Sequence, residues 1–83
     1  MNSAQLDNKI ISIISNLTGV METKIGLNDT LMGDLKMDSI ASIELVSMLA
    51  EEFDIDVEMD ETLKIERVDQ IVELARRHLG VTN

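Results

Sequence analysis

Apolar residues recur along this chain at helical spacing in three segments. With about 100° between successive residues, a first helix beginning near Ser3 gathers one apolar stripe, formed by Leu6, Ile10, Ile13, Ile14 and Leu17. A last helix carries a second stripe, formed by Val68, Ile71, Val72, Ala75 and Leu79. Gly19 and Gly80 follow the two stripes and are the predicted stops, because glycine readily takes the left-handed conformation that ends helices.

A middle helix is predicted from Ser39 to Phe53, and it has two contrasting faces. On a helical wheel its core face spans an arc of about 100° and comprises Leu45, Val46, Leu49 and Phe53. The opposite arc carries Ile40, Ile43, Glu44, Ser47 and Glu51. Two isoleucines among acids on a face that the core does not need are typical of a docking surface. The alternative is that Ile40 and Ile43 lie beneath the preceding loop.

The remaining segments complete an all-α prediction. Residues Thr18 to Met37 form a long loop, and a loop of this length in a small domain usually has a purpose. Its apolar residues are expected to plug into the core, and they are Ile25, Leu27, Leu31 and Leu35. Asp54 to Met59 is predicted to be an extended connector, and Thr62 to Ile65 a short extra turn. The expected fold is therefore an antiparallel bundle of three main helices plus one short helix, as a single domain over residues 1–83.

Size and composition narrow the functional classes. A chain of 83 residues has a small core with little room for a deep substrate pocket, so an independent enzyme is disfavoured. The absence of Cys excludes disulfides, cysteine zinc sites and thiol catalysis. No apolar run approaches the ~20 residues of a membrane span, and the N-terminus lacks a signal-peptide pattern. We expect a cytoplasmic protein without membrane insertion.

Charge is strongly segregated. The formal net charge is −9, and the segment between Met37 and Leu63 contains nine acids and no Lys or Arg, so the rest of the chain sums to zero. Such segregation disfavours nucleic acid and anionic membranes as partners and favours basic proteins or cations. The alternative is an acidic surface that serves solubility alone.

Two further patterns bear on metal binding and catalysis. Asp54, Asp56, Glu58 and Asp60 have the alternate spacing of a calcium loop, but Met59 stands where that loop needs Gly and Ile65 where it needs a bidentate Glu. No dedicated metal site is expected. His78 lies beside Arg76 and Arg77 without a serine motif or ligand partner, and is interpreted as a helix-terminus residue suited to the dipole.

One run of residues has a more specific meaning. In a single register the chain shows Asp34-Leu35, Asp38-Ser39-Ile40, Glu44-Leu45 and Glu51-Glu52-Phe53-Asp54-Ile55. This register resembles the acyl carrier proteins, and the resemblance covers roughly Leu6 to Gly80. Two departures stand out, since Lys36 occupies the usual Gly position and Ile40 replaces the commoner Leu.

The resemblance implies that Ser39 is the attachment point of phosphopantetheine, delivered from coenzyme A by a phosphopantetheinyl transferase. The positive end of a helix dipole would suit the phosphodiester there. Asp38 would cap the helix and be read by the transferase. The alternative for Ser39 is a simple N-cap.

The same resemblance implies a monomeric carrier rather than a catalyst, which holds acyl groups as thioesters and presents them to acyl-transferring and synthase enzymes with basic docking patches. The core would part between the middle and last helices to shelter the acyl chain, with Leu49, Ile65, Val68 and Ile71 as lining residues. Two alternatives stay open: a stand-alone carrier of polyketide or aminoacyl intermediates, and an acidic helical interaction domain without a prosthetic group.

Overall fold

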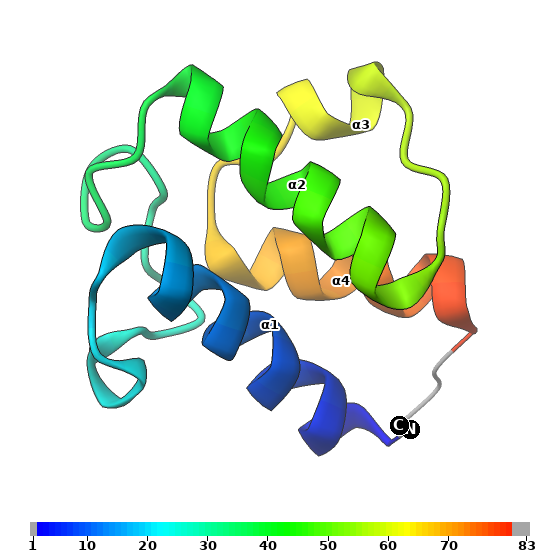
Figure 1. Ribbon diagram of the computed structural model, residues 1–83, viewed down its shortest axis with the longest axis horizontal. Coiled ribbons are helices and arrows are strands. Elements are labelled where there is room, and N and C mark those ends of the chain that lie inside the picture. The colour runs from blue at the N-terminus through cyan, green and yellow to red at the C-terminus, as the bar shows by residue number, and fades with distance from the viewer. Residues whose placement is uncertain (1, 81–83) are drawn as a thin grey trace.

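Four α-helices and one 3₁₀ turn make up the regular structure of residues 2–80, the part of the chain that the computed structural model describes (Figure 1). The helices are α1 (Ser3–Thr18), α2 (Ser39–Phe53), α3 (Met59–Leu63) and α4 (Val68–Leu79), and the 3₁₀ turn η1 spans Glu22–Lys24. α1 runs opposite to α2 and α4, and these three pack against one another while the short α3 packs on α2. The predicted fold class is confirmed.

The ends of the long helices follow from local chemistry. At the start of α1 the Asn2 side chain accepts the Gln5 N–H at 2.8 Å, and the Gln5 side chain accepts the Asn2 N–H at 3.0 Å, which forms a capping box. Gly19 and Gly80 adopt φ values of 80° and 69° directly after α1 and α4. Both predicted stops, and both predicted ends of α2, are confirmed.

The core is built from α1, α2, α4 and the long loop between α1 and α2. Its least exposed large side chains are Leu6, Ile10, Ile14, Leu31, Leu45, Val68 and Ile71. Of the loop residues predicted to plug into it, Ile25, Leu31 and Leu35 are buried, whereas Leu27 is 41% exposed. The prediction for Leu27 is wrong because this residue supports the fold through its backbone.

The loop is tied by its backbone to the start of α4. The first two N–H groups of α4, from Val68 and Asp69, donate to the carbonyls of Asp29 and Leu27 at 3.0 and 2.8 Å. In the other direction the Leu31 N–H donates to the Glu66 carbonyl at 2.9 Å. Free N–H groups at a helix start need partners, and here the loop supplies them. The crossing of the loop over the bundle is thereby fixed.

The short helix lies earlier than predicted. α3 begins at Met59, not at Thr62, because the Glu61 carboxylate reaches back to accept the Glu58 N–H at 3.2 Å and so supports the first turn. Its one buried residue is Thr62, whose hydroxyl donates to the Glu58 carbonyl. The connector before it is correspondingly shorter and begins at Asp54, which ends α2 in the left-handed conformation.

Candidate functional site

Ser39 is the first residue of α2, and its hydroxyl is exposed and makes no hydrogen bond within the described residues. The N-cap is Asp38, whose carboxylate accepts the Ala41 N–H at 2.7 Å. The predicted capping role of Asp38 is confirmed, and the alternative that Ser39 is the N-cap is wrong. Ser39 therefore presents an uncommitted hydroxyl at the positive end of a 15-residue helix.

The segment before Ser39 is held rigidly on the core. Leu35 and Met37 are buried, and the Met37 N–H donates to the Leu31 carbonyl at 2.8 Å. Asp34 closes the preceding turn, since its carboxylate accepts the Thr30 N–H at 2.9 Å and its own N–H donates to the Thr30 hydroxyl at 3.0 Å. Asp34, Leu35 and Asp38 of the motif thus have structural roles that position Ser39.

Lys36 interrupts this segment with an unusual backbone conformation. Its φ is +56°, in the left-handed region that glycine adopts without steric cost. This explains physically why Gly is usual at this position of the motif. Lys36 is exposed, so its ammonium group stays in solvent three residues before Ser39.

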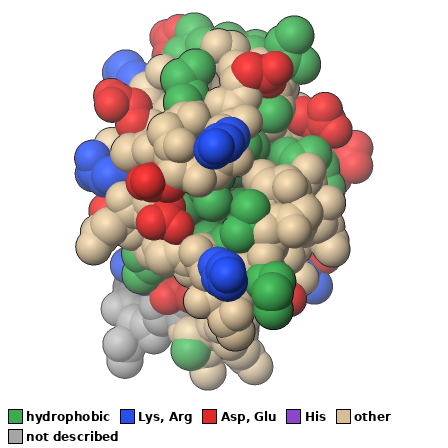
Figure 2. Space-filling model, turned by 90° about the vertical axis from the view of Figure 1, so that its left-hand side faces the viewer, with side chains coloured by type: hydrophobic (Ala, Val, Ile, Leu, Met, Phe, Trp, Pro, Cys, Tyr) green, Lys and Arg blue, Asp and Glu red, His purple; other side chains and the backbone are tan. Residues whose placement is uncertain are grey.

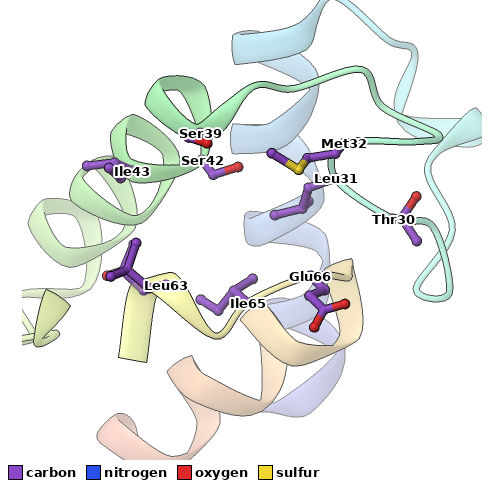
Figure 3. A pocket seen from close by; sticks show the side chains of 10 residues that line it. Thr30, Leu31, Met32, Ser39, Ser42, Ile43, Leu63, Ile65 and Glu66 are labelled. Atoms are coloured by element: carbon purple, nitrogen blue, oxygen red, sulfur yellow. The ribbon is translucent and has the colours of Figure 1, made fainter. Parts of the chain in front are cut away.

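A cavity of about 260 Å³ opens directly beside Ser39 (Figure 3). It lies between α2, α3 and the long loop, and its lining residues are Thr30, Leu31, Met32, Ser39, Ser42, Ile43, Thr62, Leu63, Ile65 and Glu66. Of the residues predicted to line an acyl pocket, Ile65 lines this cavity. Leu49, Val68 and Ile71 instead lie in the closed core, at 2%, 0% and 0% exposure. The cavity that adjoins Ser39 is thus beside α3 rather than between α2 and α4.

A second depression flanks the start of α2 on its other side. It is an open groove of about 480 Å³ lined by the end of α1, by residues 34–38 and by Val20 and Ala41. Over the end of the molecule that the long loop covers, hydrophobic side chains reach the surface between charged ones (Figure 2). Ser39 consequently stands on a ridge between two depressions, where a second protein can approach its hydroxyl.

The outer face of α2 is largely solvent-exposed. Ile40 is 74% exposed, and Glu44, Ser47 and Glu51 are exposed as well. The alternative that the loop covers both isoleucines is wrong for Ile40. Ile43 is half-buried because it forms part of the cavity wall. An exposed isoleucine with acids around it therefore lies next to Ser39.

A contact between α3 and α4 could not be predicted from the sequence. His78, in the last turn of α4, places its Nε2 at 3.2 Å from a Glu61 carboxylate oxygen of α3. The pKa of Glu61 is lowered, first by its hydrogen bond from the Glu58 backbone and then by the His78 ring. His78 lies at the helix terminus as predicted and also links α4 to the wall of the cavity.

Two negative findings apply to residues 2–80. Within that range no group of three or more His, Asp or Glu side chains is arranged to hold a metal ion. Nor is any helix in it both long enough and apolar enough to cross a bilayer.

Comparison with known proteins agrees with the geometry. Residues 8–81 match the family model described as the phosphopantetheine attachment site. The chain is 33% identical over 70 residues to the acyl carrier protein of Clostridium acetobutylicum, a match covering 84% of this chain and 91% of that protein. The crystal structure of an acyl carrier protein from Thermotoga maritima superposes with a TM-score of 0.82 at 28% identity, covering 96% of this chain and 93% of the other.

Proposed function

This chain belongs to the acyl carrier protein family, and we propose that Ser39 is the residue that bears its phosphopantetheine. The observation that carries the proposal is the free, exposed hydroxyl at the first residue of α2, beside a cavity and without a competing role as a cap. The helix dipole favours an anionic phosphodiester at that point. Asp38 fixes the backbone there and is the neighbouring group that the transferase would read.

The residues around Ser39 fit a carrier rather than a catalyst. Once attached, the group supplies a thiol that holds acyl chains as thioesters. Ser39 needs no general base from this chain, because a separate phosphopantetheinyl transferase carries out the attachment. The apolar side chains of Ile43, Leu63 and Ile65 offer a first shelter for an acyl chain. Deeper entry would require the core to part at Leu49, Val68 and Ile71.

The exposed face of α2 is the proposed docking surface for partner enzymes. Ile40 supplies apolar contact area, Ile43 lies at its border with the cavity, and Glu44, Ser47 and Glu51 surround them. Acids at the edge of such a contact attract basic patches over distance. We place the protein as a monomer in the cytoplasm, serving fatty-acid or related synthases. Polyketide or aminoacyl intermediates are the second candidate cargo.

Intact-mass measurement after incubation with a broad phosphopantetheinyl transferase and coenzyme A tests the attachment site. Wild-type protein should gain the mass of the group, and Ser39→Ala should not. Since the Ser39 hydroxyl makes no hydrogen bond, its removal should change the free energy of unfolding by less than about 1 kcal/mol. Ser42→Ala, one turn along the same helix, is the control that should still be loaded.

Two results would contradict the proposal in different ways. Loading of Ser39→Ala would move the attachment site to another residue. Wild-type protein that stays unmodified, while another carrier is loaded in the same mixture, would favour an acidic helical interaction domain without a prosthetic group.

A further inference from the structure

Apart from Ser39 itself, the polar side chains around the cavity can accept hydrogen bonds from a bound group but have no free proton to donate to it. We propose that this cavity favours acyl groups whose far end carries a cation or a hydrogen-bond donor, such as an ammonium group, over acyl groups ending in a carboxylate. The inference rests on the proposed attachment at Ser39 and specifies the class of cargo. It is carried by the three lining hydroxyls other than Ser39, by one carboxylate and by the absence of any basic side chain among the described lining residues.

Besides Ser39, whose oxygen carries the phosphodiester once the group is attached, three hydroxyls line the wall. Each of the three already donates its proton in a hydrogen bond within the protein. The Ser42 hydroxyl donates to the Asp38 carbonyl at 3.1 Å, and the Thr62 hydroxyl donates to the Glu58 carbonyl at 3.3 Å. Thr30 donates to the Asp34 carboxylate at 3.3 Å. Carbonyl and carboxylate oxygens only accept, so each of these hydroxyls can offer a bound molecule its lone pairs but no proton.

Glu66 adds a formal negative charge to the rim. Its backbone is fixed on both sides, by the Leu31 N–H on its carbonyl and by the Gln70 side chain, which accepts its N–H at 2.6 Å. Its carboxylate, by contrast, has no ion pair or hydrogen bond within the described residues. The nearest base in the sequence, Arg67, is paired with Asp69 at 3.0 Å. In Figure 3 Glu66 lies beyond Ile65 from Ile43 and Leu63, at the edge of the cavity, with its carboxylate directed away from those two side chains.

These features divide the cavity into an apolar wall and an acceptor rim. Ile43, Leu63 and Ile65 can cover a methylene segment, and a terminal ammonium can remain hydrated at the rim beside Glu66. A terminal carboxylate would instead be repelled by Glu66, the one acidic residue among the described lining residues. Since the contact is exposed, we expect a preference of about two- to fivefold in occupancy rather than an absolute selection.

Three cargoes of equal chain length test the preference. Hexanoyl, 6-aminohexanoyl and adipoyl groups are attached through an amide to coenzyme A analogues and loaded onto Ser39 by a broad transferase. The occupancy of the cavity is then measured from the methyl NMR shifts of Ile43, Leu63 and Ile65. We expect 6-aminohexanoyl to occupy the cavity about two to five times more than adipoyl at low salt, with the difference shrinking as salt screens the charges.

Glu66→Gln, which keeps the shape and removes the charge, should reduce this ratio toward one. Glu22→Gln is the matched control, because it removes the same charge from the exposed turn η1 and should leave the ratio unchanged. Equal occupancy by the two charged cargoes, or preference for adipoyl, would overturn the inference while the loading itself upholds Ser39. A ratio that survives Glu66→Gln would overturn the role of Glu66. Failure of all three cargoes to load would instead contradict the attachment site.

Discussion

Lys36 has a backbone φ of +56°, in a region that residues other than glycine rarely adopt. The left-handed region costs an L-residue about 1–2 kcal/mol. Glycine escapes this cost but loses about 0.5–1 kcal/mol through its greater freedom in the unfolded chain. The balance between these two effects decides what glycine would do at this position.

We predict that Lys36→Gly raises the free energy of unfolding by about 0.5–1 kcal/mol, measured by urea denaturation. Lys24→Gly is the control: it removes the same charge, but Lys24 lies in η1 outside the positive-φ region, so glycine should there be destabilising through its greater freedom in the unfolded chain. A destabilised Lys36→Gly would mean that the lysine side chain has a compensating contact.

Asp38 makes a different contribution, through one short hydrogen bond to the Ala41 N–H. Asp38→Ala leaves that N–H without its partner and should lower the free energy of unfolding by about 1 kcal/mol in thermal or urea unfolding. Asp38→Asn keeps an acceptor oxygen and should cost only a few tenths. Equal losses in both variants would show that the charge at the helix start, rather than the cap, supplies the stability.

At the scale of elements, α3 is the least anchored helix. It spans five residues and packs on α2, and the Glu61–His78 contact links it to α4. Because Thr62 and Leu63 line the cavity beside Ser39, this contact steadies one wall of it. The protonation of Glu61 therefore bears on both stability and the cavity.

Acidic pH should weaken the Glu61–His78 contact that links α3 to α4. The pKa of Glu61 lies below its ordinary value of 4.5 in the folded protein, so its ionised form stabilises the fold above that value and the contribution is lost as pH falls through the lowered pKa. We predict that the gap in unfolding free energy between wild type and Glu61→Gln is largest above pH 4.5 and closes in more acidic solution. Urea denaturation from neutral to acidic pH measures it.

His78→Gln should narrow the same gap, because it removes the second cause of the lowered pKa and leaves the Glu58 backbone bond in place. Glu22→Gln controls for the loss of one negative charge far from α3. A gap that stays constant with pH would contradict the role of Glu61.

The three long helices could be predicted from sequence because each combines an apolar stripe with a clear stop or cap. α3 could not be placed, since its start depends on a contact between Glu58 and Glu61 and glutamate is a weak signal for a helix start. Leu27 escapes prediction because its apolar side chain indicates burial, whereas its contribution is the carbonyl that accepts the Asp69 N–H of α4.

The candidate site likewise has a part that the sequence predicts and a part that it does not. Ser39 and Asp38 were visible in a motif. The cavity was not, because residues distant in sequence form it: Leu31 from the loop, Ile43 from α2 and Leu63 from α3. Leu49, Val68 and Ile71 lie in the interior, as their apolar stripes predict, whereas the acyl pocket between the middle and last helices is implied only by the family resemblance.

Over the whole molecule, Ser39 stands at the start of α2, and the same helix carries three acids of the acidic segment, Glu44, Glu51 and Glu52. This arrangement lets one surface attract a basic partner and present the modified residue to it. The two kinds of residue on that surface should contribute differently, because charges at an edge mainly speed association whereas buried apolar area slows dissociation. Ile40 is the better probe of the apolar part, since Ile43 also forms the cavity wall.

We predict that Glu44→Lys weakens binding to a phosphopantetheinyl transferase mainly through a slower association rate, and that added salt reduces the effect. Ile40→Ala should weaken binding by about 1 kcal/mol or more at every salt concentration, because it removes apolar contact area. Surface plasmon resonance at low and high salt separates the two, with circular dichroism to verify each fold. Glu22→Lys reverses the same charge outside α2 and should bind nearly as wild type. Normal binding by Ile40→Ala and Glu44→Lys together would place the partner surface elsewhere, with the groove between α1 and residues 34–38 as the remaining depression beside Ser39.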